Sequence, residues 1–353
     1  MAIASPRRRR SCGSWSRVSE AGDRTATPSA ASPLRICLVT PARRGSRGGN
    51  RITALRLAGL LRQLGMRPRV VEAWRGEACD VLFAIHAAKS APSVLAATAA
   101  RPALRVVVLL AGTDIYPHYA PSAATAAVLE RADALVALQP HAAAALPPAL
   151  RGKVHTIVQS ATAAPPRRGA VFRACVLAHL RPVKDPLLPI RALAQVPATL
   201  PLELVLAGRA LSEPLAAAVR AAVAAEPRAR WVGELPHRAA RELLASSHVC
   251  LVPSTAEGGA NVLSEAIAAG TPVLASAIPG NLGLLGDDWP GLFAAEDSAA
   301  LAALLVRAHT EPRFAMHLQA RTLALQAMVA PARERAALAA LLDGLGCHRR
   351  PTG

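Results

Sequence analysis

Short apolar runs alternate with amphipathic, alanine-rich segments along the chain from residue 34 onward. The first run, LRICLVT at 34–40, is continuously apolar, which is typical of a strand that is buried on both faces of a parallel sheet. The segment NRITALRLAGLLRQLG then has helical periodicity and predicts a helix that ends at Gly65. Further strands are predicted at 68–73, 79–86, 104–110, 132–139 and 153–159.

The segment SATAAPPRRG at 160–169 interrupts this pattern, because it is small, proline-rich and charged, without periodicity. The alternation then restarts, which indicates a second domain. Strands are predicted at 170–180, 201–208, 230–233, 248–254 and 271–276, with helices near 185–195, 212–225, 236–247 and 261–269.

Strands that alternate with helices in this way predict an α/β protein made of two Rossmann-like, doubly wound domains that face a common cleft. The predicted division is a tail at 1–33, a first domain at 34–163, a linker at 164–169, a second domain at 170–346 and a tail at 347–353. A helix is also predicted at about 331–345, either closing the second domain or crossing back to the first.

Composition supports a folded chain without membrane-spanning segments. The apolar content is 52% and the mean hydropathy is +0.28, and no uninterrupted apolar run reaches the length of a transmembrane helix. Residues 1–33 are rich in Arg, Ser and Pro and predict a disordered basic tail. Their four consecutive arginines are similar to a twin-arginine signal, but no apolar segment follows, and a misassigned translation start is an alternative. We expect a cytoplasmic protein.

The net charge of +18 suggests a nucleic-acid partner, but its distribution argues against one. Only three residues are lysine, and the arginines are spread along the chain rather than gathered in one stripe. Aromatic residues make up 3%, too few for base stacking. We expect phosphorylated small molecules, not nucleic acid, although a non-catalytic nucleic-acid-binding protein stays as an alternative.

The six cysteines show no metal-binding spacing, so no metal site is expected. Cys37, Cys175 and Cys250 lie in predicted strands, where a free thiol behaves as a small hydrophobic group.

Three loops carry candidate chemistry. The first, TPARRGSRGGNR at 40–51, follows the first strand and opens the first helix, where glycine amides and a helix N-terminus favour an anion. A solvated turn is the alternative. Its candidate residues are Gly48, Gly49, Arg43, Arg44, Arg47 and Arg51.

The second loop, LAHLRPVKDP, follows the first strand of the second domain. Arg181 and Lys184 are three residues apart, within reach of one phosphate, and Asp185 is a candidate cap for the next helix.

The third loop, EGGANVLSE, begins after a strand and leads into a short helix that stops at Gly270. Asn261 is the expected N-cap, and Glu257 and Glu265 converge on the helix N-terminus. The residues alone leave three interpretations open: a catalytic acid/base pair, a sugar site, or a carboxylate that merely complements the helix dipole.

The stretch VPSTAEGGANVLSEAIAAGTPVLAS resembles the signature of GT-B glycosyltransferases of family 4, and the resemblance extends over about residues 34–345. It implies a nucleotide-sugar donor in the second domain, and RWVGELPHRAARELLASSHVCLVPS resembles the stretch whose Gly-x-Leu/Val turn packs against the uracil base. Arg181 and Lys184 match the family's diphosphate-binding pair and would stabilise the leaving group without a metal or other cofactor. Glu257 would bind the donor sugar and Glu265 the ribose. Backbone amides would come from Gly258, Gly259, Ala260 and Asn261, with Gly49 close to the donor.

A narrower resemblance is to the selenosugar synthases of selenoneine biosynthesis, carried by PARRGSRGGNRITALRLAGLLRQLG, VEAWRGEACDVLFAIHAAKSAPSV, LLAGTDIY, VALQP, HLRPVKDP, EGGANVLSEAI and IPGNLGLLG. It implies transfer of N-acetylglucosamine from UDP-N-acetylglucosamine to selenophosphate, with functional coupling to a selenophosphate synthetase and an ergothioneine-synthase-like enzyme. The implied acceptor-binding residues are Arg43, Arg44, Arg47, Arg51, Lys89 and Asp114, and His86 is a candidate catalytic residue.

Several of these roles have alternatives. His86 is otherwise a satisfied structural histidine and Asp114 a turn residue, whereas Tyr116 is a candidate to stack or hydrogen-bond in the cleft. Ala111 replaces the histidine common before Gly-Thr-Asp in similar loops, which puts any role for that strand end in doubt. A family 4 enzyme with a hydroxyl or thiol acceptor, and a degenerate transferase acting as a sugar-nucleotide sensor, are alternative functions.

Overall fold

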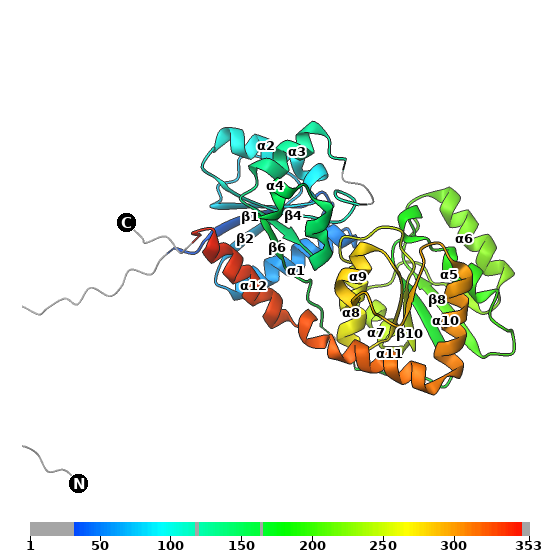
Figure 1. Cartoon of the computed structure of the whole chain (residues 1–353). Helices are drawn as coiled ribbons and strands as arrows, with labels where there is room; N and C mark the ends of the chain where they lie inside the picture. Colours follow the sequence, from blue (N-terminus) through cyan, green and yellow to red (C-terminus); the bar gives the residue numbers. More distant parts are fainter. Residues whose placement is uncertain (1–31, 117–119, 163–164, 348–353) are drawn as a thin grey trace, which may run out of the picture.

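The computed structural model describes residues 32–116, 120–162 and 165–347, and it confirms two parallel sheets of six strands each (Figure 1). The first sheet has the order β2-β1-β3-β4-β5-β6. Its strands are β1 (Arg35–Val39), β2 (Arg67–Val71), β3 (Val81–Ile85), β4 (Arg105–Leu109), β5 (Ala134–Ala137) and β6 (Val154–Thr156). The predicted tail at 1–33 lies almost wholly outside the described residues, as does most of the tail at 347–353.

Helices connect the strands of the first sheet. They are α1 (Gly49–Gln63), α2 (Ala87–Ala100), α3 (Ala123–Arg131), the 3-10 helix η1 (Pro140–Ala145) and α4 (Pro148–Arg151). Gly65 follows the end of α1 with a φ of 76°, which favours glycine. The N–H groups of Gly65 and Met66 donate to the carbonyls of Arg62 and Leu61 at 2.9 and 3.0 Å, so the predicted helix end is confirmed.

The second sheet has the order β12-β11-β10-β7-β8-β9. Its strands are β7 (Phe172–Leu177), β8 (Leu202–Ala207), β9 (Ala229–Trp231), β10 (Val249–Val252), β11 (Val273–Ser276) and β12 (Leu292–Phe293). Its helices are η2 (Pro182–Lys184), α5 (Leu188–Leu193), α6 (Glu213–Ala225), α7 (His237–Ser246), α8 (Asn261–Ala269), α9 (Pro279–Leu285), α10 (Ser298–Thr310), α11 (Pro312–Ala324) and η3 (Gln326–Val329). Each strand and helix expected in this half is present. The two-residue β12 and the helices α9, α10 and α11 were not predicted.

The last helix, α12 (Pro331–Gly344), crosses back to the first domain, one of the two alternatives that the sequence left open. In Figure 1 it runs from the second domain back to the first and lies alongside α1. Leu338, Leu341 and Leu342 are buried in the core that Leu57 and Leu61 of α1 form with the first sheet. The first domain therefore contains both early and late parts of the chain.

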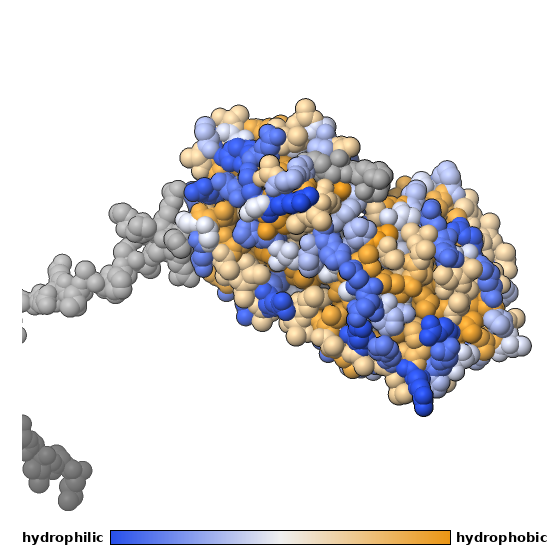
Figure 2. All heavy atoms as spheres, viewed as in Figure 1, coloured by the Kyte–Doolittle hydropathy of each residue, from blue (hydrophilic) through white to orange (hydrophobic). Residues whose placement is uncertain are grey.

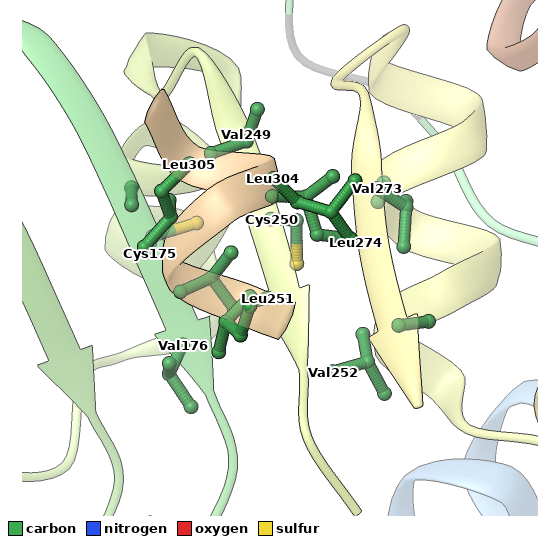
Figure 3. Packing of buried hydrophobic residues seen from close by; sticks show 14 of the residues in the cluster. Cys175, Val176, Val249, Cys250, Leu251, Val252, Val273, Leu274, Leu304 and Leu305 are labelled. Carbon is green, nitrogen blue, oxygen red and sulfur yellow. The ribbon is translucent and has the colours of Figure 1, made fainter. Parts of the chain in front are cut away.

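Cysteine side chains take part in the cores, as the sequence predicts. Cys175 of β7 and Cys250 of β10 are paired in register and lie among aliphatic side chains of the second domain (Figure 3). Cys37 and Cys79 are buried in the first domain. All four thiols are free.

The visible surface carries hydrophilic residues in several separate groups on both domains, with hydrophobic residues between them (Figure 2). Within the part of the chain that the structure describes, no helix has the length and apolar character needed to cross a membrane.

Candidate active site

A cleft of about 520 Å³ lies between the two domains, at the carboxyl ends of both sheets. Strand order reverses between β1 and β3 in the first sheet and between β7 and β10 in the second. Loops that leave a parallel sheet at such a point open a crevice in which ligands bind. The three loops singled out by the sequence follow β1, β7 and β10, so the topology brings them to one cleft.

Most of the predicted site residues line this cleft. The first domain contributes Arg47, Gly48, Gly49, His86 and Lys89, and the second contributes Arg181, Lys184, Glu257, Gly259, Ala260, Asn261 and Glu265.

Lys184 and Glu257 form an ion pair on the second-domain wall, with side chains that are 22% and 10% exposed. Ser254 donates a second hydrogen bond, of 2.7 Å, to the same oxygen, Oε1 of Glu257. The loops that carry the pair are held together because the Thr255 N–H donates to the Val183 carbonyl at 2.9 Å. The ammonium and the carboxylate thus lie side by side on the cleft wall.

Arg47, Lys89 and Arg181 add positive charge from both sides of the cleft. Lys89 and Arg181 belong to different domains, yet both act electrostatically on His86. Among the described residues, no carboxylate forms an ion pair with Arg47, Lys89 or Arg181. The N-termini of α1 and α8 also open here, with backbone N–H groups that have no intrahelical acceptor. Together these groups give the cleft a positive electrostatic character, which would favour an anion.

The start of α8 differs from the prediction. Asn261 is the first helical residue rather than the N-cap, which is Ala260, and no side chain caps the helix. Oδ1 of Asn261 instead accepts a hydrogen bond of 3.0 Å from Arg56 of α1. Asp185, by contrast, accepts from the Leu188 N–H at 3.2 Å, at the start of α5, close to its predicted capping role.

Two histidine–carboxylate pairs lie on the second-domain wall. His237 Nε2 is 3.8 Å from Oε1 of Glu265, and His179 Nε2 is 3.9 Å from Oε1 of Glu234. The carboxylate of Glu265 raises the pKa of His237 above its usual value.

The two domains touch through glycines at one end of the cleft. Gly112 has a φ of 112°, and a Cβ added to it would lie 2.3 Å from the Gly258 nitrogen. A Cβ added to Gly258 would lie 2.5 Å from the Gly112 nitrogen. Gly258 therefore lies against the first domain and does not line the cleft, unlike its neighbour Gly259.

Other predicted residues lie away from the cleft. Arg43 and Arg44 are exposed and Arg51, the third residue of α1, is partly exposed, and none of the three lines the cleft. The Asp114 side chain is 0% exposed, and its carboxylate accepts from the N–H groups of Ala87 and Gly112 at 2.9 and 2.8 Å.

Tyr116 also differs from its predicted role. It is buried in the first-domain core, and its hydroxyl accepts a hydrogen bond of 3.0 Å from Gln139. Asp114 and Tyr116 thus stabilise the loop after β4 through buried hydrogen bonds.

His86 has a strained backbone, with a φ of 70°, at the N-cap of α2. Its Nδ1 lies 3.5 Å from the Lys89 N–H and 3.7 Å from Asp114 Oδ2, and its Nε2 lies 3.1 Å from the Thr113 hydroxyl. Burial lowers the pKa of His86; the Asp114 carboxylate opposes this shift, and the charges of Lys89 and Arg181 add to it.

We expect His86→Asn to reduce the acid sensitivity of folding. Below the usual histidine pKa of 6.5, the unfolded chain binds a proton that folded His86 does not, so the free energy of unfolding falls as the pH drops below about 6.5. Asparagine tolerates the positive φ and keeps a side-chain acceptor for the cap. Urea unfolding at several pH values should give a shallower decline for the variant. His248, whose pKa burial also lowers, is present in both proteins and cancels in the difference. Equal slopes would contradict this reading of His86.

Some cleft residues were not singled out from the sequence. Gln159 is 2% exposed and Leu138 is 5% exposed, and both line the cleft at the ends of first-domain strand segments. Glu234 and His237 lie in the quoted stretch after β9, and the structure places both on the cleft wall, opposite His179 and Glu265. The one sequence signal that could have identified these residues was their position near the end of a predicted strand.

Comparisons with known proteins agree with this architecture. Residues 172–311 match the family model described as "Glycosyl transferases group 1". A comparison with curated proteins gives no match.

Among solved structures, HepE of Anabaena in complex with UDP and glucose is 16% identical, with a TM-score of 0.71, covering 88% of this chain and 100% of that chain. Sucrose-phosphate synthase of Thermosynechococcus elongatus is 18% identical, with a TM-score of 0.73 and coverages of 89% and 99%. A UDP-forming trehalose-phosphate synthase of Burkholderia vietnamiensis is 14% identical, with a TM-score of 0.60 and coverages of 85% and 81%.

At these identities the likeness is one of fold. The two domains of the chain, each with a parallel six-stranded sheet, have the architecture of the GT-B glycosyltransferases. The chain thus has the GT-B fold, and its residues 172–311 carry the sequence signature of the group 1 glycosyltransferases.

Proposed function

We propose that this protein transfers a sugar, N-acetylglucosamine, from a UDP-sugar to selenophosphate. The observation that carries the proposal is the cleft, where positive charge from both domains meets the loop at 257–261. HepE, with the same fold, has been solved with UDP and glucose. The acceptor is inferred from the resemblance of the motifs around this cleft to those of selenosugar synthases.

In the proposed donor site, Arg181 and Lys184 bind the diphosphate, Glu265 accepts from the ribose hydroxyls and Glu257 from the sugar hydroxyls. Their positions on one cleft wall support this assignment. Donor binding then requires Lys184 to share its charge between Glu257 and the phosphate. No metal or other cofactor is part of the proposal.

In the proposed acceptor site, Arg47 and Lys89 hold the selenophosphate dianion opposite the donor. These two residues support an anionic acceptor because no described carboxylate neutralises them. Selenium uses a lone pair to form a bond to the anomeric carbon as the bond from that carbon to the β-phosphate oxygen breaks. UDP leaves with the electron pair, and Arg181 and Lys184 stabilise its charge. An anionic selenium nucleophile needs little deprotonation, so a neutral His86 acts here as a positioning group.

The test is UDP release from UDP-N-acetylglucosamine by the purified protein, with and without selenophosphate, together with mass spectrometry of the sugar product. We expect selenophosphate-dependent UDP release and a product with the isotope pattern of selenium. Equal release with and without selenophosphate would contradict the proposed acceptor.

Parallel reactions distinguish the alternatives. Faster turnover of a hydroxyl or thiol compound would identify an ordinary family 4 acceptor. UDP binding without turnover of any acceptor would indicate a sensor. Salt-dependent binding of DNA or RNA without competition by UDP-sugars would indicate a nucleic-acid-binding protein. Neighbouring genes for a selenophosphate synthetase and an ergothioneine-synthase-like enzyme would support the proposal independently.

A further inference from the structure

A group of polar side chains lies where the chain passes between the two domains. We call it the crossover cluster, and its members are Arg56 of α1, Gln159 after β6, Asn261 at the start of α8 and Glu334 of α12. Gln159 lies just before the first passage of the chain into the second domain, and Glu334 just after the return passage. The cluster thus joins both crossings to the loop at 257–261.

The guanidinium of Arg56 contacts all three partners. Its Nε lies 3.1 Å from both carboxylate oxygens of Glu334. One terminal nitrogen donates to Oδ1 of Asn261 at 3.0 Å, and the other donates to Oε1 of Gln159 at 2.8 Å. A planar fork of donors suits this arrangement, and a lysine ammonium cannot reproduce it.

The cluster reaches the cleft through Gln159 and Asn261, which line it, whereas Arg56 does not. Nε2 of Gln159 donates to the Gly259 carbonyl at 2.7 Å. Two residues of the loop at 257–261 are therefore bound from the first-domain side: Gly259 through its backbone and Asn261 through its side chain.

Glu334 ties the same group to the passage between the domains. Its Oε2 accepts a hydrogen bond of 2.8 Å from the Ser160 N–H, and its side chain is 2% exposed. The Arg56 side chain is 16% exposed, so the ion pair is largely removed from water. Such pairs recover little net stability after desolvation, so the contribution of this cluster lies in fixing an arrangement.

We infer that Arg56 is a positioning residue that fixes the loop at 257–261 relative to the first domain. The inference rests on the proposed function only in taking this loop as the sugar-binding loop. Arg56 links the loop to both passages of the chain, so the geometry of the loop depends on how the two domains are placed.

The test compares Arg56→Lys with Arg62→Lys, an exposed position on the same helix. Lysine keeps the charge opposite Glu334 but loses the fork to Asn261 and Gln159. In the ligand-free protein, we expect hydrogen exchange of the segment 257–263 to become about tenfold faster in Arg56→Lys, as for the loss of one or two hydrogen bonds. Exchange in β7 and β8 should not change, and Arg62→Lys should match wild type throughout.

A kinetic measurement accompanies the exchange measurement. We expect Arg56→Lys to raise the KM for the UDP-sugar and lower kcat, with the KM for the acceptor unchanged. Unchanged exchange at 257–263, or an equal increase in all segments, would overturn the inference even in an active enzyme. Absence of UDP-sugar turnover in wild type would instead contradict the proposed function, while the exchange result would still decide the role of Arg56.

Discussion

Lys184→Met is expected to lose turnover by about 10²- to 10³-fold while the protein remains folded. Lys184 lies on the cleft wall, in the loop that the family resemblance assigns to the diphosphate. A fixed charge at a departing group is worth about this factor, because it acts on charge that develops as the bond breaks. Steady-state UDP release measures the loss. Lys184→Arg, which keeps the charge with another geometry, should lie between wild type and Lys184→Met.

The ion pair with Glu257 requires a matched control for stability. Removing Lys184 leaves the Glu257 carboxylate, which is only 10% exposed, with Ser254 as its remaining side-chain hydrogen-bond donor among the residues that the structure describes. We expect Lys184→Met to lower the melting temperature, and Lys184→Met/Glu257→Gln to recover part of it without recovering turnover. Turnover at the wild-type rate in Lys184→Met would refute the donor-site assignment.

Gly258→Ala is expected to lower turnover by more than about tenfold and to destabilise the protein by about 1–3 kcal/mol, the usual cost of forcing atoms into a packed contact. The new Cβ would meet backbone atoms of Ala111 and Gly112, between 2.5 and 2.7 Å away, and backbone has no alternative rotamer. The domains must separate where these glycines meet, which draws Gly259 away from Gln159 of the first domain.

Gly59→Ala is the matched control for Gly258→Ala. Gly59 lies within α1, where an added Cβ meets nothing within 4 Å, so this variant should be more stable than wild type by about 0.5–1 kcal/mol. Gly258 does not have a positive φ, so the effect of its substitution reports the contact and not backbone strain. Thermal unfolding and UDP release measure both variants. Wild-type activity in Gly258→Ala would show that this close approach of the domains is not needed.

The fold was largely predictable because parallel strands buried on both faces form continuous apolar runs. The path of α12 was not, because its apolar residues fit a core on either domain, and only the contact of Leu338 and Leu342 with the first-domain core decides between them. The two residues of β12 are too short to form a pattern.

The candidate site was predictable as a set of loops but not as a set of contacts. Strand ends at the two reversals brought Arg181, Lys184 and Glu257 together with Arg47, as expected. The direction of a side chain within a loop has no such rule, so Arg43 and Arg44 turned out to lie elsewhere. Asn261 was expected to cap its own helix, but Arg56, distant in sequence, binds its side chain.

The return of α12 to the first domain has a consequence for the order in which the protein is made. Leu338, Leu341 and Leu342 complete a core whose other buried residues all lie between Leu34 and Ile157 in the sequence. At about 5–20 residues per second, the ribosome supplies α12 roughly 10 to 35 s after β6. During synthesis, the part of the first-domain core that α12 covers stays exposed until the whole second domain has been translated. Translation of the first domain therefore begins before that of the second but is completed after it.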